Sequence, residues 1–219
     1  MILAIADALS PADVAAVRKA MDHAGFVDGK STAGWSARLV KDNLQAAESD
    51  EIAALRAFVG GRLAAHPVFA LATRPKTIIG PQFSRYEEGH AYGTHVDDAL
   101  IGDTRTDVSF TVFLASPDSY DGGELVVETL SGEEAFKLPA GSVITYPSAS
   151  LHRVAPVTRG ARLAAAGWVR SFIRDPSRRE LLYDLETARR RLFEREGKTM
   201  EGDLLAKCAA NLTRAWCDD

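Results

Sequence analysis

Two of the five histidines are placed where they could share a metal ion with a carboxylate. His95 and Asp97 lie two residues apart, and side chains at positions i and i+2 point to the same face of a β-strand. A third ligand must come from elsewhere in the chain, and His152 is the best placed because it follows a predicted strand over 142–146. Two histidines and one carboxylate leave about three positions of an ion open, as in the facial-triad sites of non-haem iron(II).

Each of these residues also has an ordinary structural explanation. A His-x-Asp pair arises often by chance, and a single histidine such as His152 is more often a structural or surface residue. The remaining histidines are interpreted in that way, His23 and His66 as helix-end residues and His90 as a loop residue. The metal hypothesis therefore depends on the conjunction: the pair lies near the start of a β-rich segment and His152 lies near its end.

Arg162 adds a second kind of chemistry. It follows His152 by ten residues and enters an apolar run that predicts a buried strand. A buried arginine is costly unless its charge is matched, and no carboxylate lies between Ala155 and Arg174. The planar guanidinium is suited to bidentate binding of a carboxylate, so a dicarboxylate ligand would match the charge. A long-range salt bridge to Asp107 or Glu124 is the alternative.

The stretch from 76 to 171 predicts the β structure that would position these residues. It consists of short runs rich in Val, Ile, Phe, Tyr and Thr that are separated by glycine-containing turns. Evenly spaced short strands of this kind are typical of a β-sandwich or barrel. From Val108 to Leu114, every second residue is large and apolar, which is typical of a strand with one face on a core.

Helices are predicted on both sides of this β segment. Ser10 with Pro11 and Asp175 with Pro176 are cap-plus-proline helix starts. A further helix is predicted to begin near Ser49 and to end at His66, and a last helix is predicted from about Gly202 to Trp216.

These patterns divide the chain into three segments that we expect to pack as one compact unit. They are an N-terminal helical or mixed segment packing on the core (1–74), a β core (75–173) and a C-terminal helical extension (174–219). The C-terminal helices are amphipathic, so they offer a surface for self-association into a homo-oligomer.

Composition excludes several classes of protein. An apolar fraction of 46% and a charged fraction of 26% are those of an ordinary globular protein. The net charge of -4 lacks the basic footprint of proteins that bind nucleic acid or anionic membranes. No apolar run approaches the ~20 residues that span a bilayer, no basic flank marks a signal peptide, and Cys208 and Cys217 form no disulfide or zinc pattern. We therefore expect a soluble cytoplasmic protein.

A series of short motifs runs in order along nearly the whole chain, and its most specific member extends from Ser150 to Arg162. The other members are Arg85–Gly89, Tyr92–Asp97, Asp107–Leu114, Tyr120–Leu125, Lys137–Gly141 and Tyr146–Pro147. In these motifs the chain resembles the PKHD-type hydroxylases, a bacterial group in the prolyl/lysyl hydroxylase branch of Fe(II)- and 2-oxoglutarate-dependent dioxygenases. It departs from the family pattern at Ser84 and Asp98, which indicates a different pocket shape rather than a different reaction.

The resemblance implies a mainly β fold, a double-stranded β-helix (jelly-roll) core with N- and C-terminal α-helices. It implies that His95, Asp97 and His152 hold Fe(II), that Arg162 binds the distal carboxylate of 2-oxoglutarate, and that Tyr86 hydrogen-bonds this cosubstrate. O2 would be the second cosubstrate, and 2-oxoglutarate would be decarboxylated to succinate as the substrate is hydroxylated. The family is also associated with L-ascorbate, which re-reduces the iron, and with peptidyl or siderophore-related small-molecule substrates.

Three other functions are open to a chain with these residues. A related halogenase typically lacks the metal-binding carboxylate, so Asp97 disfavours it. A zinc hydrolase would leave Arg162 without a role, and no HExxH motif occurs. A non-enzymatic, cupin-like metal- or ligand-binding jelly-roll would explain the histidines but not Tyr86 together with Arg162.

Overall fold

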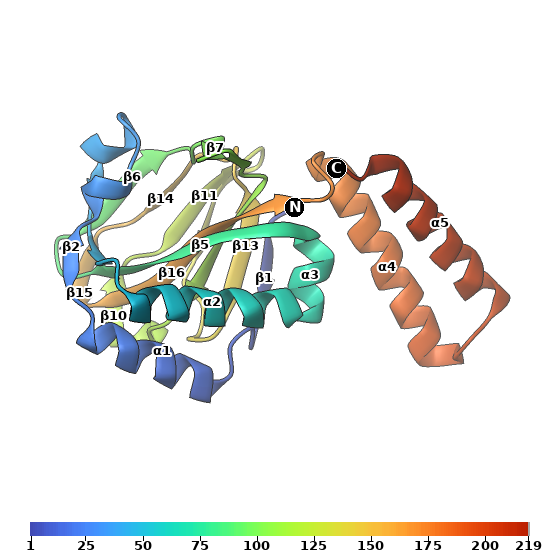
Figure 1. Ribbon diagram of the computed structural model, residues 1–219, viewed down its shortest axis with the longest axis horizontal. Helices are drawn as coiled ribbons and strands as arrows, with labels where there is room; N and C mark the ends of the chain where they lie inside the picture. The colour runs from blue at the N-terminus through green and yellow to red at the C-terminus, as the bar shows by residue number, and fades with distance from the viewer. Residues whose placement is uncertain (219) are drawn as a thin grey trace.

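The computed structural model describes residues 1–218, whose central feature is a pair of antiparallel β-sheets that face each other (Figure 1). The larger sheet has seven strands in the order β1 (Leu3–Ile5), β13 (Val143–Pro147), β9 (Val108–Phe113), β16 (Arg162–Ser171), β5 (Pro75–Tyr86), β4 (Leu44–Ala46) and β2 (Phe26–Asp28). The smaller sheet has five, in the order β12 (Gly132–Phe136), β11 (Leu125–Thr129), β14 (His152–Val154), β6 (Ala91–His95) and β3 (Lys41–Asp42).

Two short strand pairs complete the β structure. Strand β10 (Tyr120–Gly122) pairs with β15 (Val157–Gly160), and β7 (Leu100–Ile101) pairs with β8 (Thr104–Arg105). All of these strand pairs are antiparallel, and the two facing sheets form the jelly-roll core that the sequence predicted. The predicted mainly β fold with flanking helices is therefore confirmed.

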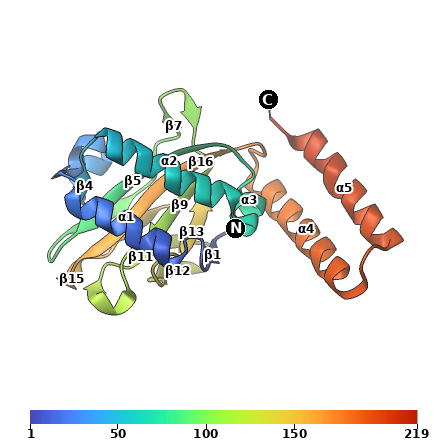
Figure 2. The same ribbon diagram turned by 60° about the horizontal axis from the view of Figure 1, so that its bottom comes forward.

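Three helices cover the outer face of the larger sheet (Figures 1 and 2). They are α1 (Pro11–His23), α2 (Asp50–Ala65) and α3 (Pro67–Thr73). The first begins at a capping box, in which Ser10 and Asp13 satisfy each other's backbone N–H groups. The apolar stripes of α1 and α2 pack on the sheet in the main core, which includes Val17, Met21, Val59, Leu63, Phe83, Phe110 and Val169.

The helix predicted over residues 49–66 is present as α2, but a third helix that the sequence analysis did not predict follows it at once. His66 ends α2, and its Nδ1 accepts a hydrogen bond from the N–H of Phe69 in α3 (3.4 Å). Pro67 therefore ends one helix and occupies the first position of the next, where its missing N–H costs nothing.

A second, smaller core lies between the two sheets. It contains Tyr86, Phe113, Leu125, Val127, Ile144, Tyr146, Val154 and Val157. Both sheets turn apolar side chains inward here, so this core packs the two sheets against each other.

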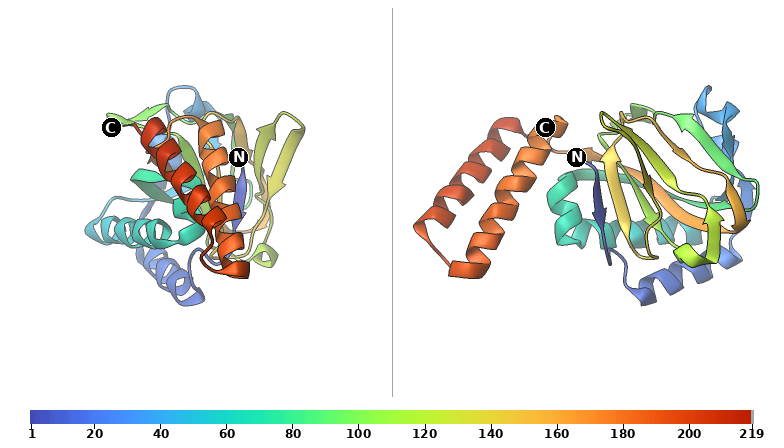
Figure 3. Two further views of the ribbon diagram at one scale, coloured as in Figure 1. Left: turned by 90° about the vertical axis from the view of Figure 1, so that its right-hand side faces the viewer. Right: turned by 180° about the vertical axis from the view of Figure 1, so that it is seen from behind.

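The C-terminal helices α4 (Pro176–Glu196) and α5 (Met200–Trp216) form a hairpin that projects away from the sheets (Figure 3). Its base is fixed by Arg179, whose Nη1 donates to the carbonyls of Ile173 and Arg174, both at 2.8 Å. Within residues 1–218, no helix combines the length and the apolar character that crossing a bilayer requires.

Candidate active site

The two predicted histidine ligands are neighbours in the smaller sheet. His95 is the last residue of β6 and His152 the first residue of β14, and the two are direct cross-strand partners. Asp97 lies beyond the end of β6, so it does not share a strand with His95 as the His-x-Asp spacing suggested. It turns toward the larger sheet instead, where its Oδ2 accepts a short hydrogen bond from the hydroxyl of Ser109 in β9.

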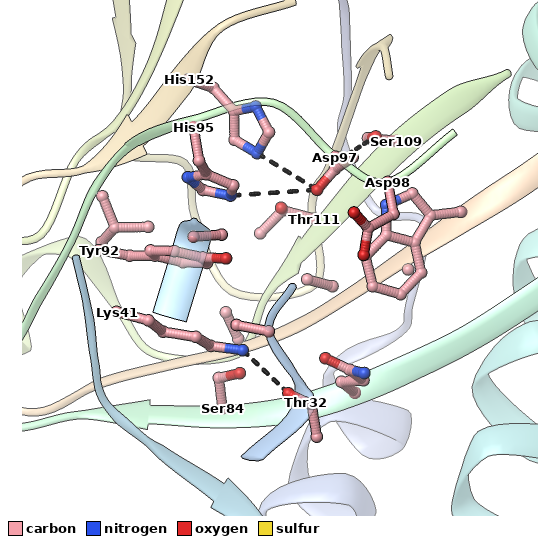
Figure 4. A pocket seen from close by; sticks show the side chains of 18 of the residues that line it. Thr32, Lys41, Ser84, Tyr92, His95, Asp97, Asp98, Ser109, Thr111 and His152 are labelled. Carbon is pink, nitrogen blue, oxygen red and sulfur yellow. Dashed lines mark hydrogen bonds and ion pairs between the residues drawn. The ribbon is translucent and has the colours of Figure 1, made fainter. Parts of the chain in front are cut away.

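The three side chains converge on one point (Figure 4). Asp97 Oδ1 lies 4.0 Å from Nε2 of His95 and 3.8 Å from Nε2 of His152, and one ligand atom from each residue lies within 4.8 Å of the others. The Nδ1 atoms face the carbonyls of Gly93 (2.9 Å) and Ser150 (3.0 Å). Since a carbonyl can only accept, each Nδ1 carries a proton, which leaves Nε2 as the ring nitrogen that faces Asp97 and could bind a metal ion.

Burial keeps the His95 ring neutral, so this ring is available to bind a cation. Desolvation and the neighbouring His152 lower the pKa of His95 to about 4, and the Gly93 carbonyl and Asp97 raise it only in part. The His95 ring is therefore neutral at neutral pH, so no imidazolium proton lies between it and the carboxylate. Two imidazoles and a carboxylate are a donor set that fits a divalent ion such as Fe(II).

A cavity of about 350 Å³ opens between the sheets beside these three residues. Of the aromatic and apolar residues that the sequence analysis considered as lining, Phe110 and Trp168 border the cavity, whereas Phe113 and Val143 are buried in the cores. Arg162 also borders it, four residues along β16 from Ala166, which lines the cavity as well.

Arg162 is only 2% exposed and lies opposite Tyr86 in the pairing of β16 with β5. Its guanidinium lies 5.0 Å from the centroid of the Tyr86 ring. Among residues 1–218 it forms no ion pair with a carboxylate, and Asp107 is bound to Arg105 instead (2.7 Å). The long-range salt bridge considered as the alternative is therefore not found in the described part of the chain.

Several buried polar atoms around Arg162 have no hydrogen-bond partner among the described residues. One of them, Nε of Arg162, belongs to a residue that lines the cavity, and the others, the hydroxyl of Tyr120 and both amide atoms of Asn43, belong to residues that do not line it. Burial raises the pKa of the Tyr86 phenol, while the positive charge of Arg162 and the Asn43 side chain act in the opposite direction. Buried polar groups are normally satisfied, so the buried guanidinium of Arg162 at this end of the cavity fits an anionic ligand such as a carboxylate.

The sequence analysis missed other polar residues at this site. Ser109 is a buried hydroxyl in a strand whose every residue is buried, and a serine within such a strand was a usable signal. Lys41, Gln45 and Gln82 also border the cavity. Lys41 lies on a strand of two residues, which has no periodicity to read, so nothing in the sequence marked it.

Comparison with known proteins identifies the family of the chain. The family model of the 2OG-Fe(II) oxygenase superfamily matches residues 81–170. A PKHD-type hydroxylase of Gloeothece citriformis is 49% identical, and one of Acaryochloris marina is 50% identical, each over 100% of both chains. The chain therefore belongs to the PKHD-type hydroxylases of the 2OG-Fe(II) oxygenase superfamily.

Solved structures share the fold at lower sequence identity. A prolyl-4-hydroxylase from Pseudomonas putida matches with a TM-score of 0.53 and 21% identity, covering 78% of this chain and 92% of that one. HygX from Streptomyces hygroscopicus, solved with nickel, 2-oxoglutarate and hygromycin B bound, matches with a TM-score of 0.55 and 17% identity, covering 78% and 84%. The protein is accordingly an Fe(II)- and 2-oxoglutarate-dependent hydroxylase that uses O2.

Proposed function

We propose that His95, Asp97 and His152 bind the iron of this hydroxylase and that Arg162 and Tyr86 bind 2-oxoglutarate. One observation carries the proposal: the three ligand atoms converge at the side of a cavity that also holds a buried guanidinium with no carboxylate partner among residues 1–218. A dianion that reaches from the ion to Arg162 would satisfy both ends at once.

In this arrangement the protein positions the metal ligands and the cosubstrate. The bonds from Nδ1 of His95 and His152 to backbone carbonyls orient the rings and make Nε2 a better ligand. Arg162 and Tyr86 would hold the distal carboxylate of 2-oxoglutarate and so orient the cosubstrate. The iron, when bound with 2-oxoglutarate and O2, supplies the oxidising power that converts a substrate C–H bond to C–OH and yields succinate and CO2.

The assignment is tested by metal-dependent turnover. Protein stripped with a chelator should form no succinate from 2-oxoglutarate, Fe(II) should restore succinate formation, and Zn(II) should not. Candidate substrates should then be screened for faster succinate formation and for a product about 16 Da heavier, the mass of one oxygen atom. Succinate formed equally with and without Fe(II) would contradict the proposal.

We further propose that the substrate is peptidyl or a siderophore-related small molecule, and that L-ascorbate sustains turnover by keeping the iron reduced. The PKHD-type relatives support a hydroxylase, and a cavity of about 350 Å³ is at the small end of ligand sites. Ascorbate should extend the number of turnovers before inactivation without changing the initial rate of succinate formation.

We also place the protein in the cytoplasm and propose that it forms homo-oligomers through the α4–α5 hairpin. Leu181, Phe193 and Leu204 on the hairpin are each more than half exposed, which leaves apolar surface for a second copy. Light scattering of the full chain and of a Phe193→Glu variant would measure the mass in solution.

Ser109 should be needed for the geometry of the metal site although it is no ligand. Its hydroxyl holds Asp97 Oδ2, so Ser109→Ala frees the carboxylate to rotate away from the histidines. We expect Fe(II) affinity to fall by about 10–100-fold, as for other partners of metal ligands. Anaerobic Fe(II) titration measures this, with Ser131→Ala in the exposed β11–β12 turn as the control; equal affinities would show that Asp97 is positioned without Ser109.

A further inference from the structure

Lys41 is a buried cation that the proposed metal and cosubstrate sites leave without a role. It lies on β3, the edge strand of the smaller sheet, opposite Tyr92 of β6. The chain leaves this sheet at Asn43 and enters the larger one at Leu44, so Lys41 lies at the side where the two sheets meet. The residue is 5% exposed, and its side chain borders the cavity (Figure 4).

The contacts of Lys41 leave part of its ammonium unsatisfied. Nζ donates to Thr32 Oγ1 (3.0 Å), the only hydrogen-bond partner that Nζ has within residues 1–218, and lies 5.2 Å from the centroid of Tyr92. Thr32 donates onward to Gln45 Oε1 (2.6 Å), and Gln45 donates to Gln82 Oε1 (2.9 Å). Lys41 is therefore the charged end of a hydrogen-bonded polar row along the cavity wall.

No carboxylate forms an ion pair with Lys41 in the described part of the chain. Burial lowers the pKa of Lys41 to about 8, while the more distant Asp97 and Asp28 raise it, so the ammonium is the main form at neutral pH. A buried charge without a counter-ion is unfavourable, which makes the position selective for a ligand that carries the opposite charge.

The loaded site would not supply this counter-ion. The two positive charges of Fe(II) and the one of Arg162 are matched by Asp97 and by the two carboxylates of 2-oxoglutarate. Lys41 then still lacks a direct partner, because Asp98, the other carboxylate that borders the cavity, forms no ion pair with it among residues 1–218. An anionic group that pairs directly with the Lys41 ammonium would therefore have to come from the substrate.

We infer that Lys41 binds a carboxylate of the substrate, so that the hydroxylated molecule is a small organic acid or a peptide with a free terminal carboxylate. The inference rests on the metal and cosubstrate sites proposed above. The Tyr92 ring separates Lys41 from the metal ligand His95. It stacks on His95 with ring centroids 3.7 Å apart, and Lys41 lies on its other side. The reacting carbon therefore lies a few bonds from the carboxylate.

The test uses full-length protein loaded with Ni(II) and saturating 2-oxoglutarate, in which binding is measured without turnover. The probes are a panel of N-acetyl-L-amino acids, each paired with its carboxamide, and tripeptides with free or amidated C-termini. Calorimetric titration should show that acids bind roughly tenfold or more tightly than their amides. If only the N-acetyl amino acids bind more tightly as acids than as amides, the substrate is a small organic acid. If the tripeptides show the same preference, the substrate is a peptide with a free C-terminus.

Lys41→Met should remove this preference, because the affinity for the acids should fall to that for the amides. Lys41→Arg should keep part of the preference. Lys30→Met, an exposed lysine of the same segment, is the matched control and should behave as wild type. An unchanged dissociation constant for 2-oxoglutarate in Lys41→Met shows that the variant is folded and that the cosubstrate is held elsewhere.

Three results would overturn the inference. They are equal binding of acids and amides to wild type, including no binding of either; an acid preference that survives in Lys41→Met; and a loss of 2-oxoglutarate binding in that variant, which would make Lys41 a cosubstrate anchor. Failure of the underlying proposal has a different signature, because wild-type protein would then not bind 2-oxoglutarate in a metal-dependent way at all.

Discussion

His152→Ala abolishes hydroxylation and weakens Fe(II) binding by more than about 100-fold. This is the expected result because the imidazole is one of three ligand atoms, and loss even of a residue that merely supports a ligand costs about 10–100-fold. His95 and Asp97 would remain, yet two donors do not hold the ion on one face of the site. Anaerobic Fe(II) titration and succinate formation measure the two effects.

The matched control is His23→Ala, an exposed histidine at the end of α1 that is remote from the cavity. It should retain wild-type metal content and turnover. Since His152 is 6% exposed, its variant should also be checked by near-ultraviolet circular dichroism for loss of packing. A folded His152→Ala variant with full metal stoichiometry and activity would refute its assignment as a ligand.

Arg162→Ala should raise the dissociation constant of 2-oxoglutarate by roughly 30-fold or more. The estimate corresponds to about 2–5 kcal/mol for truncating one partner of a buried charge pair, at ~1.4 kcal/mol per decade. Fe(II) binding should survive, because Arg162 is not among the converging ligand residues. Titrating 2-oxoglutarate into anaerobic Fe(II) protein, and following the metal-to-ligand charge-transfer absorption, reports both events separately.

Two further variants sharpen this measurement. Arg162→Lys should be intermediate, because lysine keeps the charge but offers no planar pair of donors. Arg159→Ala is the control: Arg159 is exposed on β15 and paired with Asp121, outside the cavity. If Arg162→Ala bound 2-oxoglutarate as tightly as wild type, the dicarboxylate would have to be held by another group, and Lys41 would be the first to examine.

The local sequence was sufficient to predict the features that depend on interactions between residues close together in the chain. Ser10, Ser49 and Asp175 cap helices where the sequence predicted, because a cap is an interaction between residues two or three positions apart. The β core was readable because strand residues alternate between faces within a few positions. The sequence singled out His95, Asp97 and His152 only through their conjunction at the two ends of the β segment, and Arg162 because it enters an apolar run without a nearby carboxylate.

Only the tertiary structure decided how these residues meet. The pairing of β6 with β14 makes His95 and His152 neighbours although they are far apart in the chain, and the Ser109 hydroxyl of the opposite sheet sets the direction of Asp97. Lys41 was invisible for the same reason: a two-residue strand exists because β6 pairs with it, and not because of its own propensity. Long-range strand pairing and burial are properties of the packed sheets, and no short stretch of sequence encodes them alone.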